Sequence, residues 1–264
     1  TKNSRSVHGS STKTNACVKE TFMAPEVPTL LPGCTAPARL ATNASLYALG
    51  RSLNFSSEMT TTLMREAKVT RIRLGKSKLF VTMRSDPKDA KTCTLLVKEF
   101  GRDEYGLLTG KDGGQMLDIG GHVGTTAIMY ALLNPHATVH SFEPSPVSYF
   151  YFAWNAWMNA VPERSLVIHN VALSADSNPL VFEYAPDHST SAKAVRMGAT
   201  WGHATKMRTT VKTERLPTIL ELCGIDDLRF LKLDCEGCEI DLVPANERFF
   251  RETRATIVGD FHSW

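Results

Sequence analysis

One stretch of the chain decides the fold, Gln115-Met116-Leu117-Asp118-Ile119-Gly120-Gly121-His122-Val123-Gly124, which leads directly into an apolar helical pattern. The spacing predicts a buried strand over Gln115 to Ile119 and a helix over Thr125 to Leu133 that ends before Asn134-Pro135. Glycine lets a backbone approach a ligand closely, and the first N–H groups of a helix have no partner within that helix. This strand, turn and helix therefore predict a ligand-binding turn.

Short apolar runs alternate with helical patterns over the rest of residues 111–264. Strands are predicted at Thr138–Phe142, Ser165–Val171, Phe230–Leu233 and Thr256–Val258, and helices at Pro146–Ala160, Leu216–Cys223 and from about Glu239. Leu180–Tyr184 and Met207–Thr213 are predicted to form a hairpin around a long polar loop. Continuous apolar strands alternating with helices indicate an α/β fold, a mostly parallel sheet with helices on both faces and added β-hairpins.

Two segments precede this 111–264 domain. Residues 1–40 are rich in Pro, Ser and Thr, and they bury too little apolar area to offset the entropy of ordering, so a disordered tail or stem is predicted. Residues 41–110 are predicted to be an extension packed on the core. A helical pattern over residues 41–67 is followed by a hairpin over Val69–Met83 that turns at Gly75.

Composition excludes several classes of protein. With 264 residues, 42% hydrophobic and 22% charged, the chain is long and apolar enough for one large domain with a sizeable core. Its formal net charge of +3 is too small for an evident nucleic-acid binder. The longest apolar stretch, Ala127 to Leu133, is far shorter than the roughly 20 residues of a membrane span, so no membrane segment is predicted.

The sequence does not decide the cellular compartment of the protein. As given, the chain is expected to be soluble, and a cytoplasmic location is favoured. Because the chain starts at Thr1 rather than Met, removal of an upstream signal or anchor, and hence a location in the lumen of the secretory pathway, is the alternative.

Ligands of such sheets bind beyond the carboxyl ends of the strands, near the point where the strand order reverses. The first strand tip holds Asp118, Gly120, Gly121, His122, Val123 and Gly124. His122 replaces the second glycine of the dinucleotide fingerprint, and the acidic Asp118 disfavours the phosphates of NAD. The tip suits a ligand that carries positive charge, such as an amino acid ammonium attached to a sulfonium. A plain strand-to-helix turn is the alternative.

The next two tips favour a nucleoside-bearing ligand. Glu143, followed by Pro144, stands 25 residues after Asp118, close to the spacing at which such sheets place a ribose-binding carboxylate. At the third tip, Val171 and Ala172 are predicted either to sandwich a flat adenine or to form a plain turn.

The fourth tip, Lys232 to Glu239, carries paired acids and paired cysteines. Asp234 and Glu236 are candidates for a general base or for holding a cation. Cys235 and Cys238 supply only two of the four ligands of a zinc site, so packing is favoured over a zinc or redox pair, and no metal site is predicted. At the fifth tip Asp260 precedes His262, which is a base, a metal ligand or a packed terminal residue.

In their order along the chain, these motifs resemble the FkbM family of S-adenosylmethionine-dependent methyltransferases. The family motifs D-x-G-A-N-x-G, F-E-P, N-x-A-L-S, K-x-D-x-E-G-x-E and acid-x-H resemble residues 118–124, 142–144, 170–174, 232–239 and 260–262. The paired asparagines on the family's second helix resemble Asn155 and Asn159. The resemblance covers the chain from about Gln115 to its end.

The resemblance implies a Rossmann-like class I methyltransferase sandwich and S-adenosyl-L-methionine as the cofactor, bound by the first three tips and Asp234. It implies O-methylation of a hydroxyl on a sugar, a glycolipid or another natural product, so the expected partner is a small-molecule or glycan acceptor. Asp234, Glu236 or His262 would remove the hydroxyl proton. The family's sheet usually has two further antiparallel strands, so either the chain is truncated or the hairpin over Val69–Met83 supplies an edge.

Two alternatives stand beside this interpretation. The first is an NAD-linked oxidoreductase or sugar epimerase on a similar sheet, which the glycine spacing and Asp118 disfavour. The second is a non-catalytic binding module that keeps a degenerate cofactor fold, which the short C-terminal region favours.

Overall fold

The computed structural model describes residues 42–74, 80–85, 98, 100–109, 113–185, 188–195 and 207–260. Before residue 113 the labelled elements are α1 (Asn43–Ser52), α2 (Ser57–Glu66), β1 (Lys68–Arg73), β2 (Phe80–Ser85) and η1 (Leu107–Thr109). The next elements are β3 (Gln115–Ile119), α4 (Thr125–Leu133), β4 (Thr138–Phe142), α5 (Pro146–Met158), β5 (Leu166–His169), β6 (Ala172–Ser174), β7 (Leu180–Ala185) and β8 (His188–Val195). The last are β9 (Met207–Val211), β10 (Thr213–Arg215), α6 (Leu216–Leu222), β11 (Leu228–Leu233), α7 (Glu239–Ala245), α8 (Glu247–Glu252) and β12 (Thr256–Gly259). The predicted tail over residues 1–40 and the predicted turn at Gly75 lie outside the described residues.

The main sheet has five strands in the order β12-β11-β3-β4-β5. Every pairing within it is parallel, and Asp118 on β3 lies opposite Ser141 on β4 and Lys232 on β11. The strand order reverses at β3, because β4 and β5 follow on one side and β11 and β12 on the other. This is the predicted α/β, Rossmann-like sheet, and its switch point brings the carboxyl ends of β3, β4 and β11 together.

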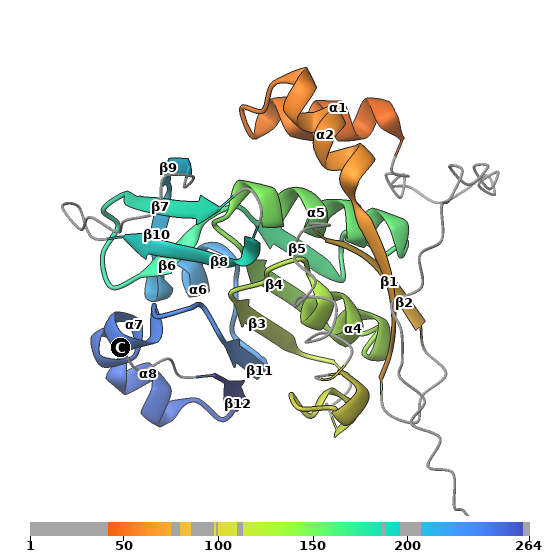
Figure 1. Cartoon of the computed structure of the whole chain (residues 1–264). Coiled ribbons are helices and arrows are strands. Elements are labelled where there is room, and N and C mark those ends of the chain that lie inside the picture. The colour runs from red at the N-terminus through yellow and green to blue at the C-terminus, as the bar shows by residue number, and fades with distance from the viewer. Residues whose placement is uncertain are drawn as a thin grey trace, which may run out of the picture.

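Helices α4 and α5 cover one face of the sheet (Figure 1). Their apolar side chains pack against Met116, Val139 and Phe230 of the strands. Helix α5 is buried along most of its length, because the N-terminal region covers the side that faces away from the sheet. Phe150 and Trp154 are buried there.

Helices α6, α7 and α8 cover the opposite face (Figure 1). Leu216 and Ile219 of α6 and Leu242 of α7 belong to one buried cluster with alternate strand residues, Leu117, Leu231 and Leu233. Both faces are therefore apolar, which explains why the strands are continuous apolar runs in the sequence.

The hairpin of β1 and β2 forms its own antiparallel two-stranded sheet. The expectation that it supplies an edge of the main sheet is wrong. Ile72 and Leu74 are fully buried in the cluster that contains α4 and α5, so the hairpin lies against helices instead of pairing with a strand. The hydroxyl of Tyr151 on α5 also donates to the backbone oxygen of Leu63 on α2 at 3.1 Å.

Two small sheets complete the described part of the chain. Strand β7 pairs antiparallel with β9, as predicted, while β8, predicted to be loop, pairs with the other side of β7. Strand β6 pairs in parallel with β10. The residues after Asn170 therefore soon enter a strand, and the alternative of a plain turn at Ala172 is wrong. None of the described helices is long and apolar enough to cross a membrane.

Candidate active site at the strand tips

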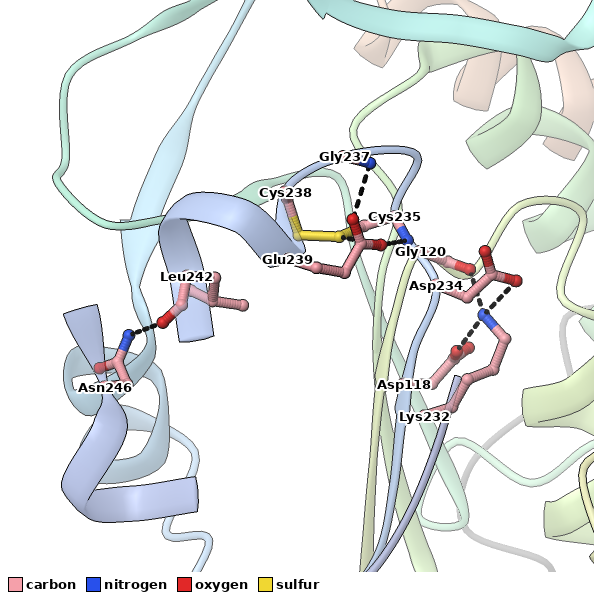
Figure 2. The surroundings of a disulfide bond; sticks show 10 residues. All are labelled: Asp118, Gly120, Lys232, Asp234, Cys235, Gly237, Cys238, Glu239, Leu242 and Asn246. Carbon is pink, nitrogen blue, oxygen red and sulfur yellow. Dashed lines mark hydrogen bonds and ion pairs between the residues drawn. A yellow bond between two sulfur atoms is a disulfide. The ribbon is translucent and has the colours of Figure 1, made fainter. Parts of the chain in front are cut away.

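A buried lysine joins the tips of β3 and β11. Lys232 Nζ lies 3.3 Å from Asp118 Oδ1 and 3.6 Å from Asp234 Oδ2, and it donates to the backbone oxygen of Gly120 at 2.8 Å (Figure 2). Asp118 is fully buried, and its other oxygen accepts a hydrogen bond from Ser141 Oγ at 2.6 Å. The charge of Asp118 is therefore directed at Lys232 within the protein.

Lys232 is held in its charged form. Burial lowers the pKa of its amine, but the carboxylates of Asp118 and Asp234 outweigh burial, so the pKa lies above its ordinary value. The ammonium also lies 5.7 Å from the centre of the Tyr105 ring, and the Tyr105 hydroxyl donates to Asp234 Oδ2 at 3.0 Å. Tyr105 lies in the N-terminal region, which thus contributes directly to the strand-tip site.

Glycines allow the β3 turn to pack closely. Gly120 has a φ of +91° and lies against the backbone of Asp234, while Gly124 has a φ of +86° and faces the ring of Phe152. A Cβ atom at either position would meet these neighbours at clashing distance, and both backbone conformations disfavour L side chains. The turn is therefore fixed by its own packing.

Helix α5 ties this turn down. Asn155 is fully buried, and its amide donates to the backbone oxygen of Val123 at 2.8 Å. This hydrogen bond joins the helix to the turn after β3. Asn159 instead donates to the backbone oxygen of Asn155, one turn back in its own helix.

Glu143 links the tips of β3 and β4. One carboxylate oxygen accepts from the N–H of His122 and the other from the N–H of Ser145, each at 2.7 Å. His122 itself has a φ of +49°, in the left-handed region. Burial raises the pKa of Glu143 to about 8, although the two N–H donors and the charge of Lys232 lower it.

The third tip is anchored to the second. The amide of Asn170 donates to the backbone oxygens of Glu143 and Pro144, at 2.8 and 3.1 Å. Val171 is half-buried beside the cluster under α6, and Ala172 is buried in a small cluster with Phe182 and Val211. The side chain of Ala172 is thus part of the packing between β6 and its neighbours.

Cys235 and Cys238 form a disulfide in the turn after β11 (Figure 2). The preference for simple packing is wrong here, because spacing alone did not show that the two sulfur atoms meet. Glu239 closes the same turn, since its carboxylate accepts from the N–H groups of Cys235 and Gly237, both at 2.8 Å. Glu236, half-buried with a φ of +57°, lies between the two bridged residues.

A family model described as the methyltransferase FkbM domain matches residues 118–264. The match starts at Asp118 and includes every strand tip described above. The chain belongs to the FkbM methyltransferase family. It has no significant match among curated proteins.

Three solved structures of archaeal proteins are similar to part of this FkbM-family chain. A transferase from Pyrococcus horikoshii is 15% identical over 43% of this chain and 44% of that chain, with a TM-score of 0.31. TYW2 from P. horikoshii, in complex with MeSAdo, is 17% identical over 40% and 36%, with a TM-score of 0.32. Wild-type Trm5b from Pyrococcus abyssi is 14% identical over 43% and 34%, with a TM-score of 0.27. Less than half of the length of each protein is matched, and likeness at this level carries no argument about activity.

The fifth tip is described only in part. Strand β12 pairs with β11, with Gly259 opposite Leu233, so Asp260 follows directly beside the β11 tip. His262, a predicted base of the FkbM domain, lies outside the described residues.

Several residues of the site were not identified from the sequence as contributors. Ser141 binds Asp118, and Tyr105 binds Asp234, although neither was part of a predicted tip. Lys232 and Glu239 were noted only as letters of a family motif. The alternation of side chains along β4 could have placed Ser141 beside Asp118, whereas no local pattern indicates Tyr105.

Proposed function

We propose that this FkbM-family chain is an S-adenosylmethionine-dependent methyltransferase that methylates a hydroxyl of a sugar, a glycolipid or another natural product. The observation that carries the proposal is the position of Glu143. Its carboxylate joins the glycine turn after β3 to the start of α5, at the switch point of the sheet.

The groups at the carboxyl ends of β3, β4 and β5 fit an adenosyl group. Each oxygen of Glu143 accepts one backbone N–H, and the carboxyl group keeps either a second lone pair or, in the protonated form that its raised pKa favours, an O–H for a ribose hydroxyl. The turn from Gly120 to Gly124 is held in place by packing and by Asn155, so the backbone near the ligand is set before binding. Val171 would supply apolar contact for the adenine.

Asp118 acts in this proposal as a positioning residue. It is fully buried, and it holds Lys232, which in turn binds the backbone oxygen of Gly120. Through this chain of contacts the carboxylate fixes the turn that receives the amino acid end of the cofactor. Loss of Asp118 would therefore weaken cofactor binding even without direct contact.

The acidic groups after β11 are the proposed bases. S-adenosylmethionine supplies an electrophilic methyl group when bound, so the protein must orient the acceptor hydroxyl and take up its proton. Asp234 is partly exposed, with 24% of its side chain accessible, and Tyr105 orients it. Glu236 and His262 are the other proposed bases.

We also propose a domain organisation for the chain. Residues 111–264 form the methyltransferase domain, and residues 41–110 form an extension that covers α5 and supplies Tyr105. Residues 1–40 are proposed to be a tail or stem.

Calorimetric titration with S-adenosylmethionine and S-adenosylhomocysteine tests the proposal. Saturable binding to both is expected, and Glu143→Ala and Asp118→Asn are expected to weaken it at least tenfold. The exposed Glu221 on α6 supplies a matched control, because Glu221→Ala leaves the strand tips intact. A screen of hydroxylated acceptors with a labelled methyl donor then identifies the product.

Glu236→Ala separates catalysis from binding. Removal of a general base is expected to lower turnover by about a hundredfold or more, while cofactor affinity stays within about twofold of the parent chain. Saturable binding of NADH instead would favour an oxidoreductase, and no saturable heat with any of these ligands would favour a non-catalytic module. Either result would reject the proposed activity.

A further inference from the structure

Two histidines and a cysteine meet on the face of the sheet that α6 covers. His140 lies on β4, His169 ends β5, and Cys223 follows the last residue of α6. One ring nitrogen of each histidine and the sulfur of Cys223 all lie within 4.8 Å of one another. None of the three belongs to the strand-tip motifs.

Both histidines present unsatisfied nitrogen atoms. His140 is only 7% exposed, and among the described residues neither His140 Nδ1 nor His169 Nε2 has a hydrogen-bond partner. Buried polar side-chain atoms are nearly always hydrogen-bonded, so two nitrogens without partners, on rings that each bring one nitrogen near a cysteine sulfur, need an explanation. A metal ion bound through these nitrogens would satisfy both.

Packing holds the two imidazoles in place. The rings of His140 and His169 stack with centroids 5.8 Å apart, and the ring of Phe142 stacks on His169 at 4.4 Å. Burial lowers the pKa of both histidines, so the rings are neutral at pH 7 and each keeps a lone pair. A neutral imidazole is the form that ligates metals.

We propose that His140, His169 and Cys223 bind a Zn²⁺ ion. Two imidazole nitrogens and a thiolate suit this borderline-soft cation, and three protein ligands leave a fourth tetrahedral position for water. With metal–ligand distances of about 2.0–2.3 Å, the ligand atoms of such a site lie about 3.3–3.6 Å apart, which small side-chain rotations can provide from the present arrangement. On binding, the Cys223 thiol loses its proton to solvent, and its sulfur forms the bond to zinc.

The site would join the end of α6 to β4 and β5, the two strands on one side of the switch point. The backbone oxygen of His169 accepts from the N–H of Glu143, so the site lies one residue from the second strand tip. It is nevertheless a separate site, because its side chains face α6 while Asp118 and Lys232 face the opposite side of the sheet.

Titration of the metal-free full chain with Co²⁺ under argon tests the site directly. Tetrahedral cobalt bound to a thiolate is expected to give visible ligand-field bands and a near-ultraviolet thiolate-to-metal band at one equivalent. Zn²⁺ should abolish both by displacement. Cys223→Ser should lose the thiolate band, and His169→Gln should weaken cobalt binding at least tenfold.

Two control variants locate the signal. His136→Ala removes an exposed histidine outside the cluster, and the double change Cys235→Ser with Cys238→Ser removes the bridged sulfur atoms of the strand-tip turn. Both should keep the bands. Bands that persist in Cys223→Ser, or that disappear only with Cys235 and Cys238, would overturn the proposal, as would the absence of any band in the parent chain.

A stability measurement covers the case in which a variant folds poorly. With free Zn²⁺ at a hundred times the dissociation constant, the unfolding equilibrium constant of the parent chain should fall about a hundredfold. Cys223→Ser, which changes one half-buried atom, should show little or none of this response. Equal zinc responses in the two chains would also reject the site.

Discussion

Lys232 balances the charges at the switch point of the sheet. It is 4% exposed, and it faces a fully buried carboxylate, Asp118, and a partly exposed one, Asp234. A buried charge is tolerated only when it is paired and hydrogen-bonded. The residues therefore act as a unit, and removal of one leaves another unpaired.

Lys232→Met is expected to lower the free energy of unfolding by about 3–5 kcal/mol, because it leaves Asp118 buried and uncompensated. Adding Asp118→Asn should recover much of the loss. Chemical denaturation of the two single variants and the double variant measures the coupling.

The exposed pair of Arg248 and Glu252 provides the control for this experiment. Arg248→Met should change the unfolding free energy by no more than about 0.5 kcal/mol, because solvent screens that ion pair. A loss in Lys232→Met as small as the control would contradict the paired-charge interpretation.

Glu143 makes stability depend on pH near neutrality. Its pKa is raised to about 8 in the folded chain, so between its ordinary pKa and pH 8 the native state holds a proton that the unfolded chain has released. The unfolding free energy contributed by this group should therefore fall as pH rises from 6.5 to 8, by at most about 1.4 kcal/mol per pH unit. Denaturation of the parent chain and of Glu143→Gln at several pH values measures the slope.

The pH range from 6.5 to 8 separates the effect of Glu143 on stability from that of His169. The pKa of His169 is lowered to about 4 by burial and by the neighbouring His140, so its opposite effect, stability rising with pH, is largely complete by pH 6.5. Glu143→Gln should flatten the slope above pH 6.5. An unchanged slope in this variant would assign the dependence to another group.

At the scale of elements, α5 positions the glycine turn through one amide. Asn155→Ala should cost about 1–3 kcal/mol, because it leaves the backbone oxygen of Val123 without this donor, and it should also weaken cofactor binding. Asn159→Ala is the matched variant four residues on, where the lost bond lies within the helix. Calorimetry and denaturation of both should show the larger effect on cofactor affinity in Asn155→Ala.

The sequence is informative about elements that bury apolar runs. The bounds predicted for Gln115–Ile119 and Thr138–Phe142 match the strands, because a strand covered on both faces must be apolar throughout. The short strand β6 and the strand β8 were missed, because each depends on pairing with distant residues more than on its own pattern.

The sequence predicts the parts of the site that follow from strand spacing, but not the contacts between residues far apart in the chain. Asp118 and Glu143 were placed at neighbouring tips from spacing, and the parallel sheet brings those tips together. The contact between Tyr105 and Asp234 joins residues 129 positions apart, which no local pattern encodes. The cysteine spacing was compatible with zinc, a redox pair or packing, and only the turn geometry shows a disulfide.

At the scale of the whole molecule, the N-terminal helices share one core with the sheet. Leu46 on α1 and Leu63 on α2 belong to the same buried cluster as Val139 and Phe230. Leu46→Ala, which truncates a side chain that is 1% exposed, should cost about 2–5 kcal/mol and lower the midpoint of a single transition. Circular dichroism and tryptophan fluorescence should report coincident unfolding curves. A separate early transition would show that residues 41–74 unfold on their own.

The Cys235–Cys238 bridge has a practical consequence for assays. It spans a four-residue loop, for which loop-closure entropy gives only about 2 kcal/mol, so its main effect is on the direction of Glu236. Protein prepared in dithiothreitol should melt a few degrees below protein prepared in air and should turn over more slowly. Equal rates in the two preparations would show that Glu236 keeps its place without the bridge. Storage buffer is thus an experimental variable for this protein.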